Sequence, residues 1–347
     1  MTRWAVVLAG GIGSRFWPLS TPERPKQLLP LVSDEPLLVA TLARLEPIIP
    51  QEHTLILTNA ALADTIARAV PRIPRKNILA EPRPAGTAAA LAWAATEIER
   101  RSGAQSTMIS VHADWAIGDD NGFRDALLAA ERIAIAERAL VTVGVVPTRP
   151  DPGLGYIEPG RETENGAREV RRFVEKPTRE RAEWMAHEGY LWNSGIFAWV
   201  VGDFLSEVRS LTPEVAPALA AHSARASDID AFFAAVTPVS VDVGVLERTT
   251  RIRVIPGDFG WDDIGTWSSL RRAKPEDSSG NVAAGRVHAV DSRGNVVHAE
   301  DTAVVLYGVT DLVVVSSNGL TLVTTTERAT DLKKLVDSLP SELRQPS

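Results

Sequence analysis

The sequence predicts an α/β protein with a doubly wound, mainly parallel Rossmann-like sheet and a smaller, β-rich C-terminal domain. Two observations in the first half support this. Short apolar runs alternate with longer helical patterns, and the first apolar run leads directly into a glycine-rich loop. A third observation is a change of composition after Pro275, where the chain becomes rich in Val, Thr and Gly. We therefore expect one domain over residues 1–275 and a second over residues 276–347.

The elements of the first domain follow from their hydrophobic periods. Continuous apolar runs are typical of strands buried on both faces, whereas apolar residues three and four positions apart indicate helices. The predicted strands cover residues 4–9, 53–58, 107–111 and 140–146. The predicted helices cover residues 37–49, 61–70, 87–101 and 123–138. In such sheets ligands bind at the carboxyl ends of the strands, where the glycine loop and Asp114 fall.

Shorter elements fill the rest of the chain. The middle part predicts a helical stretch over residues 205–235, interrupted at Pro213 and Pro217, and β segments at residues 155–158, 170–174 and 196–200. Residues 281–326 predict short strands with tight turns, and the Gly-Asn pairs at 280–281 and 294–295 suggest the repeat of a β-helical coil. Residues 327–339 predict an amphipathic helix with an apolar face formed by Leu332, Leu335, Val336 and Leu339.

Composition excludes several classes of protein. The chain of 347 residues has no cysteine, which rules out disulfides, thiolate catalysis and cysteine-based zinc sites. A net charge of −7 argues against nucleic-acid binding, although a local cluster of Arg and Lys can still bind a phosphorylated small molecule. The sequence has no apolar stretch of membrane-spanning length and no signal-peptide pattern at its N-terminus. We therefore expect a cytoplasmic protein that binds neither nucleic acid nor membrane.

The N-terminal loop combines glycines with two cations. Gly10, Gly11 and Gly13 follow the first predicted strand, and Arg15 and Lys26 come after them. Because glycine has no Cβ, the backbone N–H groups of such a loop can contact phosphate oxygens closely. A guanidinium can form paired hydrogen bonds with phosphate, and an ammonium adds a point charge. The loop lacks the third glycine of the dinucleotide fingerprint and does not match the Walker pattern, so it predicts another kind of phosphate ligand.

Two aspartates from distant loops are candidate metal ligands. Asp114 follows the predicted strand at 107–111, and Asp263 lies between Gly260 and Trp267. Mg²⁺ prefers oxygen ligands, keeps several waters, and usually takes one or two carboxylates together with substrate phosphates. The two aspartates fit that demand, with Asp262 as an alternative to Asp263.

Two further segments carry polar groups suited to a sugar phosphate. Glu175 and Lys176 follow a predicted strand and offer an acceptor for hydroxyl groups and a cation for phosphate. Asn193 lies between Trp192 and Phe197, where an amide can bind hydroxyl groups beside aromatic side chains. These segments predict that the ligand includes a sugar.

In this order the motifs resemble those of the sugar-1-phosphate nucleotidylyltransferases over nearly all of the first 275 residues. Residues 8–15 (Leu-Ala-Gly-Gly-Ile-Gly-Ser-Arg) are similar to the signature of the superfamily. Four further segments resemble the branch of the superfamily that uses mannose and guanosine: residues 16–20, 25–29, 192–197 and 261–267. The resemblance implies that residues 1–275 are a nucleotidyltransferase catalytic domain. It implies transfer of GMP from GTP to mannose 1-phosphate, giving GDP-mannose and pyrophosphate.

The same resemblance implies roles for single residues. Asp114 and Asp263 would hold Mg²⁺, while Arg15 would hold the departing pyrophosphate and Lys26 would stabilise charge on the α-phosphate. The nucleotide would be bound by Leu8, Ala9, Gly10, Gly11, Gly13, Glu81 and Thr87. The sugar phosphate would be bound by Gly155, Glu175, Lys176 and Asn193. A β-rich C-terminal piece that ends in a helix also suits pairing of two subunits as a homodimer.

The sequence departs from the family pattern in two places. Ala85 and Gly86 stand where Arg and Asn are usual in the base-recognition segment, so guanine would be read by Glu81, with Arg83 as a partial substitute. Trp115 follows Asp114 where the family usually has His. Two alternative functions stay open: the same chemistry with glucose 1-phosphate and UTP or dTTP, and a catalytically silent relative that binds nucleotide sugars.

Overall fold

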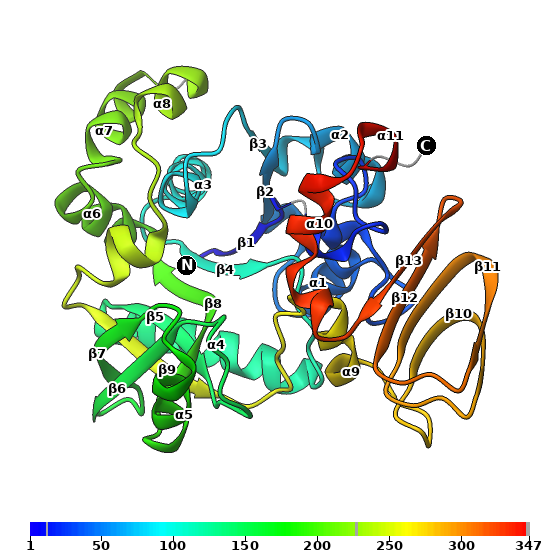
Figure 1. The fold of residues 1–347 in the computed structure, drawn as a ribbon. Helices are drawn as coiled ribbons and strands as arrows, with labels where there is room; N and C mark the ends of the chain where they lie inside the picture. The colour runs from blue at the N-terminus through cyan, green and yellow to red at the C-terminus, as the bar shows by residue number, and fades with distance from the viewer. Residues whose placement is uncertain (12, 226–227, 345–347) are drawn as a thin grey trace. The chain divides into compact units, whose positions relative to one another are not determined.

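The computed structural model describes residues 1–11, 13–225 and 228–344, which form two compact units (Figure 1). The first unit comprises Met1–Gly10, Leu42–His112 and Asp119–Trp261. The second unit comprises Gly11–Thr41, Ala113–Gly118 and Asp262–Ser347. Both units draw on separate stretches of the chain, so the assignment of residues 1–275 and 276–347 to two domains stays a prediction.

A nine-stranded sheet organises the described residues of the first unit. Its order is β3-β2-β1-β4-β8-β5-β9-β7-β6. β8 and β7 run antiparallel to their neighbours, whereas the pairs β3–β2, β2–β1, β1–β4 and β5–β9 are parallel. The predicted α/β class with a mainly parallel sheet is therefore confirmed. The strands are β1 (Arg3–Leu8), β2 (Thr54–Asn59), β3 (Ile78–Glu81), β4 (Thr107–His112), β5 (Leu140–Val145), β6 (Tyr156–Glu162), β7 (Arg168–Val174), β8 (Leu191–Val200) and β9 (Ile252–Gly257).

Several strands differ from the prediction. β8 begins at Leu191 instead of residue 196, so the Trp-Asn-Ser-Gly segment lies within the sheet. A register shift between Val143 and Gly144 of β5 lets β8 continue past its glycine. β3 and β9 were not predicted, because β3 has only four residues and β9 includes an arginine and a proline.

Helices of the first unit begin and end at recognisable signals. α4 begins three residues earlier than predicted because the Asp119 side chain accepts a hydrogen bond from the Asn121 backbone N–H. The predicted stretch at 205–235 is three helices, and its residues 226 and 227 lie outside the described residues. The helix α5, in which four of nine residues are Arg or Glu, was not predicted. The helices are α2 (Ala63–Ala69), α3 (Thr87–Ser102), α4 (Asp120–Glu137), α5 (Arg179–His187), α6 (Val201–Leu211), α7 (Ala216–Arg225) and α8 (Ile229–Ala235).

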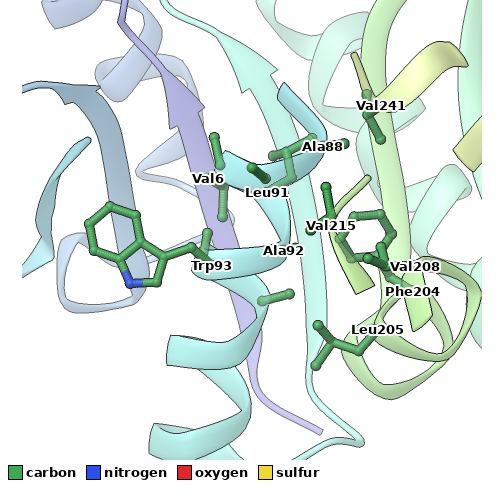
Figure 2. Packing of buried hydrophobic residues seen from close by; sticks show 14 of the residues in the cluster. Val6, Ala88, Leu91, Ala92, Trp93, Phe204, Leu205, Val208, Val215 and Val241 are labelled. Atoms are coloured by element: carbon green, nitrogen blue, oxygen red, sulfur yellow. The ribbon is translucent and has the colours of Figure 1, made fainter. Parts of the chain in front are cut away.

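The alanine-rich helix α3 is the centre of the hydrophobic core of the first unit. Figure 2 shows it between Val6 of β1 and the side chains of Phe204 and Leu205 from α6. Its alanines are buried, and their small side chains let both neighbours approach closely. This packing fixes the N-terminal end of α3, which carries Thr87.

In the second unit, the described residues include a four-stranded sheet in the order β10-β11-β12-β13 (Figure 1). The pairs β10–β11 and β11–β12 are parallel and β12–β13 is antiparallel. The Gly-Asn repeat has a structural role, because Asn281 Oδ1 accepts hydrogen bonds from Asn295 N and Nδ2 at 3.0 and 2.9 Å. The strands are β10 (Val282–Val290), β11 (Val296–Tyr307), β12 (Leu312–Ser317) and β13 (Leu320–Thr325).

Apolar residues of the N-terminal loop share a core with this sheet. The cluster joins Phe16, Trp17, Leu19 and Leu29 to Val296, Val313, Val315, Leu322 and Leu332. The predicted helix at 327–339 is shorter, because Arg328–Asp331 form a 3₁₀ turn before it. α1 (Leu37–Leu45) ends before Pro47 and contributes residues to both units. The other helices of the second unit are α9 (Leu270–Ala273), α10 (Leu332–Ser338) and α11 (Ser341–Arg344). Among the described helices of the chain, none has both the length and the apolar character that a membrane crossing requires.

Candidate active site

The glycine loop begins where β1 ends. Ala9 donates its backbone N–H to the Leu57 carbonyl at 2.8 Å, which continues the sheet past Leu8. A Cβ atom at Gly10 or Gly11 would meet open space, so this backbone has a face free of side chains. Gly13 has a φ of 71°, and a Cβ there would overlap the Lys26 side chain. Gly13 therefore lets the loop turn tightly against Lys26.

Lys26 is the centre of the predicted catalytic group in the second unit. Its side chain is 7% exposed, and Nζ lies 3.0 Å from Asp114 Oδ2. Nζ also donates a hydrogen bond to the backbone carbonyl of Asp263 at 2.8 Å. Arg15 donates to the Gly265 carbonyl at 3.2 Å. A Cβ on Gly265 would lie 2.8 Å from Asp263 Oδ2 and 3.2 Å from an Arg15 nitrogen, so Arg15, Lys26, Asp114 and Asp263 lie together.

A short bridge explains how the two aspartate loops meet. Ala116 and Asp262 exchange backbone hydrogen bonds of 2.9 and 3.1 Å. The Asp262 carboxylate is buried and accepts hydrogen bonds from Arg272 at 2.6 and 3.0 Å and from the Ile264 N–H at 2.9 Å. Asp262 thus holds the loop, and Asp263 is the neighbour that faces Arg15.

The donor set of this group suits a hard divalent cation. It offers two carboxylates, from Asp114 and Asp263, whose residues both contact the Lys26 ammonium. The described residues include no group of three His, Cys, Asp or Glu side chains that could enclose a metal ion. An ion such as Mg²⁺, which takes one or two carboxylates and completes its shell with water and substrate phosphate, matches this incomplete set.

The segment predicted to recognise the base lies in the first unit. Glu81 ends β3, and burial raises the pKa of its carboxyl to about 7. Gly86 has a φ of 81°, and a Cβ at that position would overlap the Val239 carbonyl. Thr87 Oγ1 accepts a hydrogen bond from the Val241 N–H at 2.9 Å. Glycine at residue 86 is therefore required by the close passage of the chain at Val239.

Arg83 is already occupied. It donates hydrogen bonds to the backbone carbonyls of Ala234 at 3.3 Å and Val236 at 2.9 Å. The side chain thus fastens the end of α8 to the segment after β3.

The four residues predicted to bind a sugar phosphate also lie close together in the first unit. The Asn193 N–H donates to the Gly155 carbonyl at 2.8 Å. A Cβ on Gly155 would lie 2.7 Å from Glu175 Oε2 and 3.5 Å from Asn193 Cβ. Lys176 Nζ lies 3.1 Å from Glu175 Oε1, and both side chains are exposed. Because residue 155 is a glycine, the Glu175 carboxylate can approach its Cα closely.

Sequence reasoning missed Asp242, which contacts this group. Asn193 Nδ2 donates to Asp242 Oδ1 at 2.7 Å, and Asp242 begins a π-helical turn that ends at Leu246. Burial raises the pKa of Asp242, opposed by the hydrogen bond from Asn193. One signal was available: Asp242 is the only charged residue in the run from Val239 to Leu246.

Comparison with known proteins finds two matching family models. A family model described as nucleotidyl transferase matches residues 4–280, and one described as the MannoseP isomerase/GMP-like beta-helix domain matches residues 285–339. Mannose-1-phosphate guanylyltransferases of Klebsiella pneumoniae and Escherichia coli K12 are 35% and 36% identical, over 98% of this chain and 74% of each relative. A crystal structure from Thermus thermophilus, described as a mannose-1-phosphate geranyltransferase, aligns with a TM-score of 0.90 at 34% identity, covering 97% of this chain and 99% of that one.

Proposed function

This chain belongs to the nucleotidyl transferase family, and we propose on that premise that it is a mannose-1-phosphate guanylyltransferase, also called GDP-mannose pyrophosphorylase. Its enzyme class is nucleotidyltransferase, and its substrates are a nucleoside triphosphate and a sugar phosphate. The observation that carries the proposal is the close grouping of Arg15, Lys26, Asp114 and Asp263. As finer predictions, the enzyme works in the cytoplasm and forms a homodimer.

The proposed reaction is an in-line displacement at phosphorus. A phosphate oxygen of mannose 1-phosphate attacks the α-phosphorus of GTP, the bond from that phosphorus to the bridging oxygen of the β-phosphate breaks, and pyrophosphate leaves with the electron pair. The nucleophile is already an anion, so catalysis depends on positioning and on neutralising charge. We assign Lys26 to the α-phosphate and Arg15 to the departing pyrophosphate.

A divalent cation completes the proposed machinery. Asp114 and Asp263 would hold it, and Mg²⁺ is our choice because the donors are carboxylates and phosphates. When bound, such an ion neutralises phosphate charge and orients the reacting oxygens. Lys26 lies against both aspartate residues and would keep them in place before the substrates bind.

The proposed function is tested by release of pyrophosphate. We expect release with GTP, mannose 1-phosphate and Mg²⁺ together, and none when either substrate is omitted. UTP or dTTP with glucose 1-phosphate is expected to react at least about tenfold more slowly. Preference for that second pair would replace the proposal by the related activity, and no release with any pair would indicate a silent binding protein.

Guanine recognition by Glu81 predicts a pH dependence. Because burial raises its pKa to about 7, Glu81 is increasingly protonated below that pH and loses its acceptor for the guanine N1–H and 2-amino groups. We expect the KM for GTP to rise up to about tenfold between about pH 8 and about pH 6. The Glu81→Gln variant serves as control. GTP titrates identically in both experiments, but the KM of the variant for GTP should change less with pH because residue 81 no longer titrates. Equal KM values of the wild type for GTP and for ITP, which lacks the 2-amino group, would contradict this role.

Sugar binding by Asn193 predicts an effect at Asp242. The Asp242→Asn change replaces the carboxyl acceptor by an amide, whose oxygen accepts more weakly, and should loosen the Asn193 side chain. Loss of a hydrogen bond of about 0.5–1.5 kcal/mol corresponds to a rise of roughly 2- to 10-fold in the KM for mannose 1-phosphate. The KM for GTP should change less than about threefold. Asp203→Asn, at another buried aspartate of the first unit, is the matched control, and equal effects of the two variants on the sugar KM would refute the assignment.

A further inference from the structure

An ion pair connects the turn that carries Lys26 to the four-stranded sheet of the second unit, β10 to β13. Arg24 donates from two nitrogens to Glu300 of β11, at 3.0 Å to Oε2 and 2.8 Å to Oε1. This is the paired geometry in which a guanidinium fixes the orientation of a carboxylate. Both side chains are partly buried, with exposed fractions of 38% and 26%.

The sheet is shaped locally to present Glu300. The register of β10 and β11 shifts between Gly285 and Arg286, so that Gly285 faces Ala299 and Arg286 faces Ala303. The residues between Ala299 and Ala303 therefore have no partner in β10 and form a bulge. Gly285 permits this, because a Cβ there would overlap the Ala299 carbonyl. Bulges re-aim side chains, and here the re-aimed side chain is Glu300.

Neighbouring groups hold the Glu300 carboxylate in its ionised form. Burial raises its pKa, but the hydrogen bonds from Arg24 and from Ser317 Oγ, at 2.6 Å, together with the charges of Arg24 and His298 leave the pKa lowered. His298 Nε2 lies 3.8 Å from Oε1. The acceptor side of the pair is thus built into the sheet.

On the donor side, Arg24 is part of a closed turn. Its carbonyl accepts from the Thr21 N–H at 3.1 Å, and its N–H donates to the Thr21 carbonyl at 3.2 Å. Pro25 follows, and a 3₁₀ turn begins at Lys26. A shift of Arg24 is therefore transmitted over two residues to an ammonium group that contacts both Asp114 and Asp263.

We infer that Glu300 is a positioning residue: through Arg24 it holds the turn that aims Lys26 at Asp114 and Asp263. The inference rests on the proposed function for its catalytic consequence. This positioning role predicts that the four-stranded sheet affects the rate of the reaction without contacting a substrate. Loss of the pair should lower kcat, because small misplacements of a catalytic group cost rate steeply, while the KM for GTP should change little.

The test compares Glu300→Gln with Glu214→Gln. Glu214 forms a matched pair with Arg248, with two contacts of 2.9 and 2.8 Å and exposed fractions of 32% and 24%, in the first unit. We expect Glu300→Gln to lower kcat about tenfold and Glu214→Gln to leave it within about twofold, at similar losses of stability in urea. A normal kcat in Glu300→Gln, or equal losses in both variants, would overturn the inference.

Arg24 variants separate positioning from direct binding of substrate. If Arg24 acts through Glu300, then Arg24→Gln, Glu300→Gln and the double variant should lose similar activity, and the exchange Arg24→Glu with Glu300→Arg should restore part of it. If Arg24 itself bound phosphate, Glu300→Gln would free it and activity would not fall, which would refute the positioning role.

A chemical readout keeps the inference testable if the proposed substrates fail. The Lys26 amine is nearly buried, and it contacts Asp114 Oδ2 and the Asp263 carbonyl. An acylating reagent should therefore modify it slowly in the wild type. We expect its modification, followed by mass spectrometry, to be at least about threefold faster in Glu300→Gln and unchanged in Glu214→Gln. Unchanged labelling in both variants would refute the inference, whatever reaction the enzyme catalyses.

Discussion

Replacement of Lys26 by methionine is expected to lower kcat about 10²- to 10³-fold, the scale seen when one preorganised charged donor is lost from a reacting oxygen. The reason is geometric. The ammonium lies 3.0 Å from Asp114 Oδ2, donates to the Asp263 carbonyl at 2.8 Å, and is the buried cation of this group. Methionine keeps an unbranched apolar side chain of similar length, so the core around Phe16 should stay packed. Steady-state kinetics with GTP and mannose 1-phosphate measure the effect.

The matched control for this variant is Lys274→Met. Lys274 is also a partly buried lysine of the second unit, and burial lowers its pKa. Because it contacts neither Asp114 nor Asp263 among the hydrogen bonds and ion pairs of the described residues, kcat should stay within about threefold of the wild type. A Lys26→Met enzyme as active as the Lys274→Met enzyme would remove Lys26 from the mechanism.

Asp114→Asn and Asp263→Asn are expected to lower kcat by about 10³-fold each, and to raise the Mg²⁺ concentration needed for half-maximal rate. Loss of one carboxylate from a site with only two removes several kcal/mol of charge stabilisation, and each 1.36 kcal/mol is a factor of about ten. Titration of the initial rate with Mg²⁺ separates weaker binding of the ion from slower chemistry at saturation.

Asp262→Asn is the neighbour that distinguishes a ligand from a support. Its carboxylate is committed to Arg272 and to the Ile264 N–H, so the change should lower the unfolding free energy by about 1–3 kcal/mol. The Mg²⁺ concentration for half-maximal rate should not move. If Asp262→Asn shifts the Mg²⁺ titration and Asp263→Asn does not, the two residues exchange roles.

The parallel part of the sheet could be predicted because its signal is local. β1, β2, β4 and β5 each contain a buried apolar stretch, and β1, β2 and β4 are followed by the glycine loop or by a helix. β9 and α5 escaped the same reasoning, since Arg253 and Pro256 break the apolar run of the strand and four of the nine residues of the helix are Arg or Glu. The sequence pattern therefore predicts those elements whose buried residues are adjacent or regularly spaced in the sequence.

The site divides in the same way. The residues of the glycine loop and the two aspartates were predicted from motifs, and the structure places the four catalytic candidates together. Asp242 and Glu300 were not predicted, because their partners Asn193 and Arg24 lie 49 and 276 residues away in the sequence. Periodicity carries no information about such pairs. Only the folded chain shows that a bulge or a π-helical turn aims them.

The hydrogen bond from Trp17 Nε1 to the Arg344 carbonyl spans 327 residues, at 3.2 Å. On a ribosome that adds about 5–20 residues per second, roughly 15 to 65 seconds pass between synthesis of the two partners. Until β11, β12 and α10 have been synthesised in the later part of that interval, Phe16, Trp17 and Leu19 lack the partners that bury them in the folded protein. The nascent chain therefore carries the apolar residues of its N-terminal glycine loop unburied for most of its synthesis.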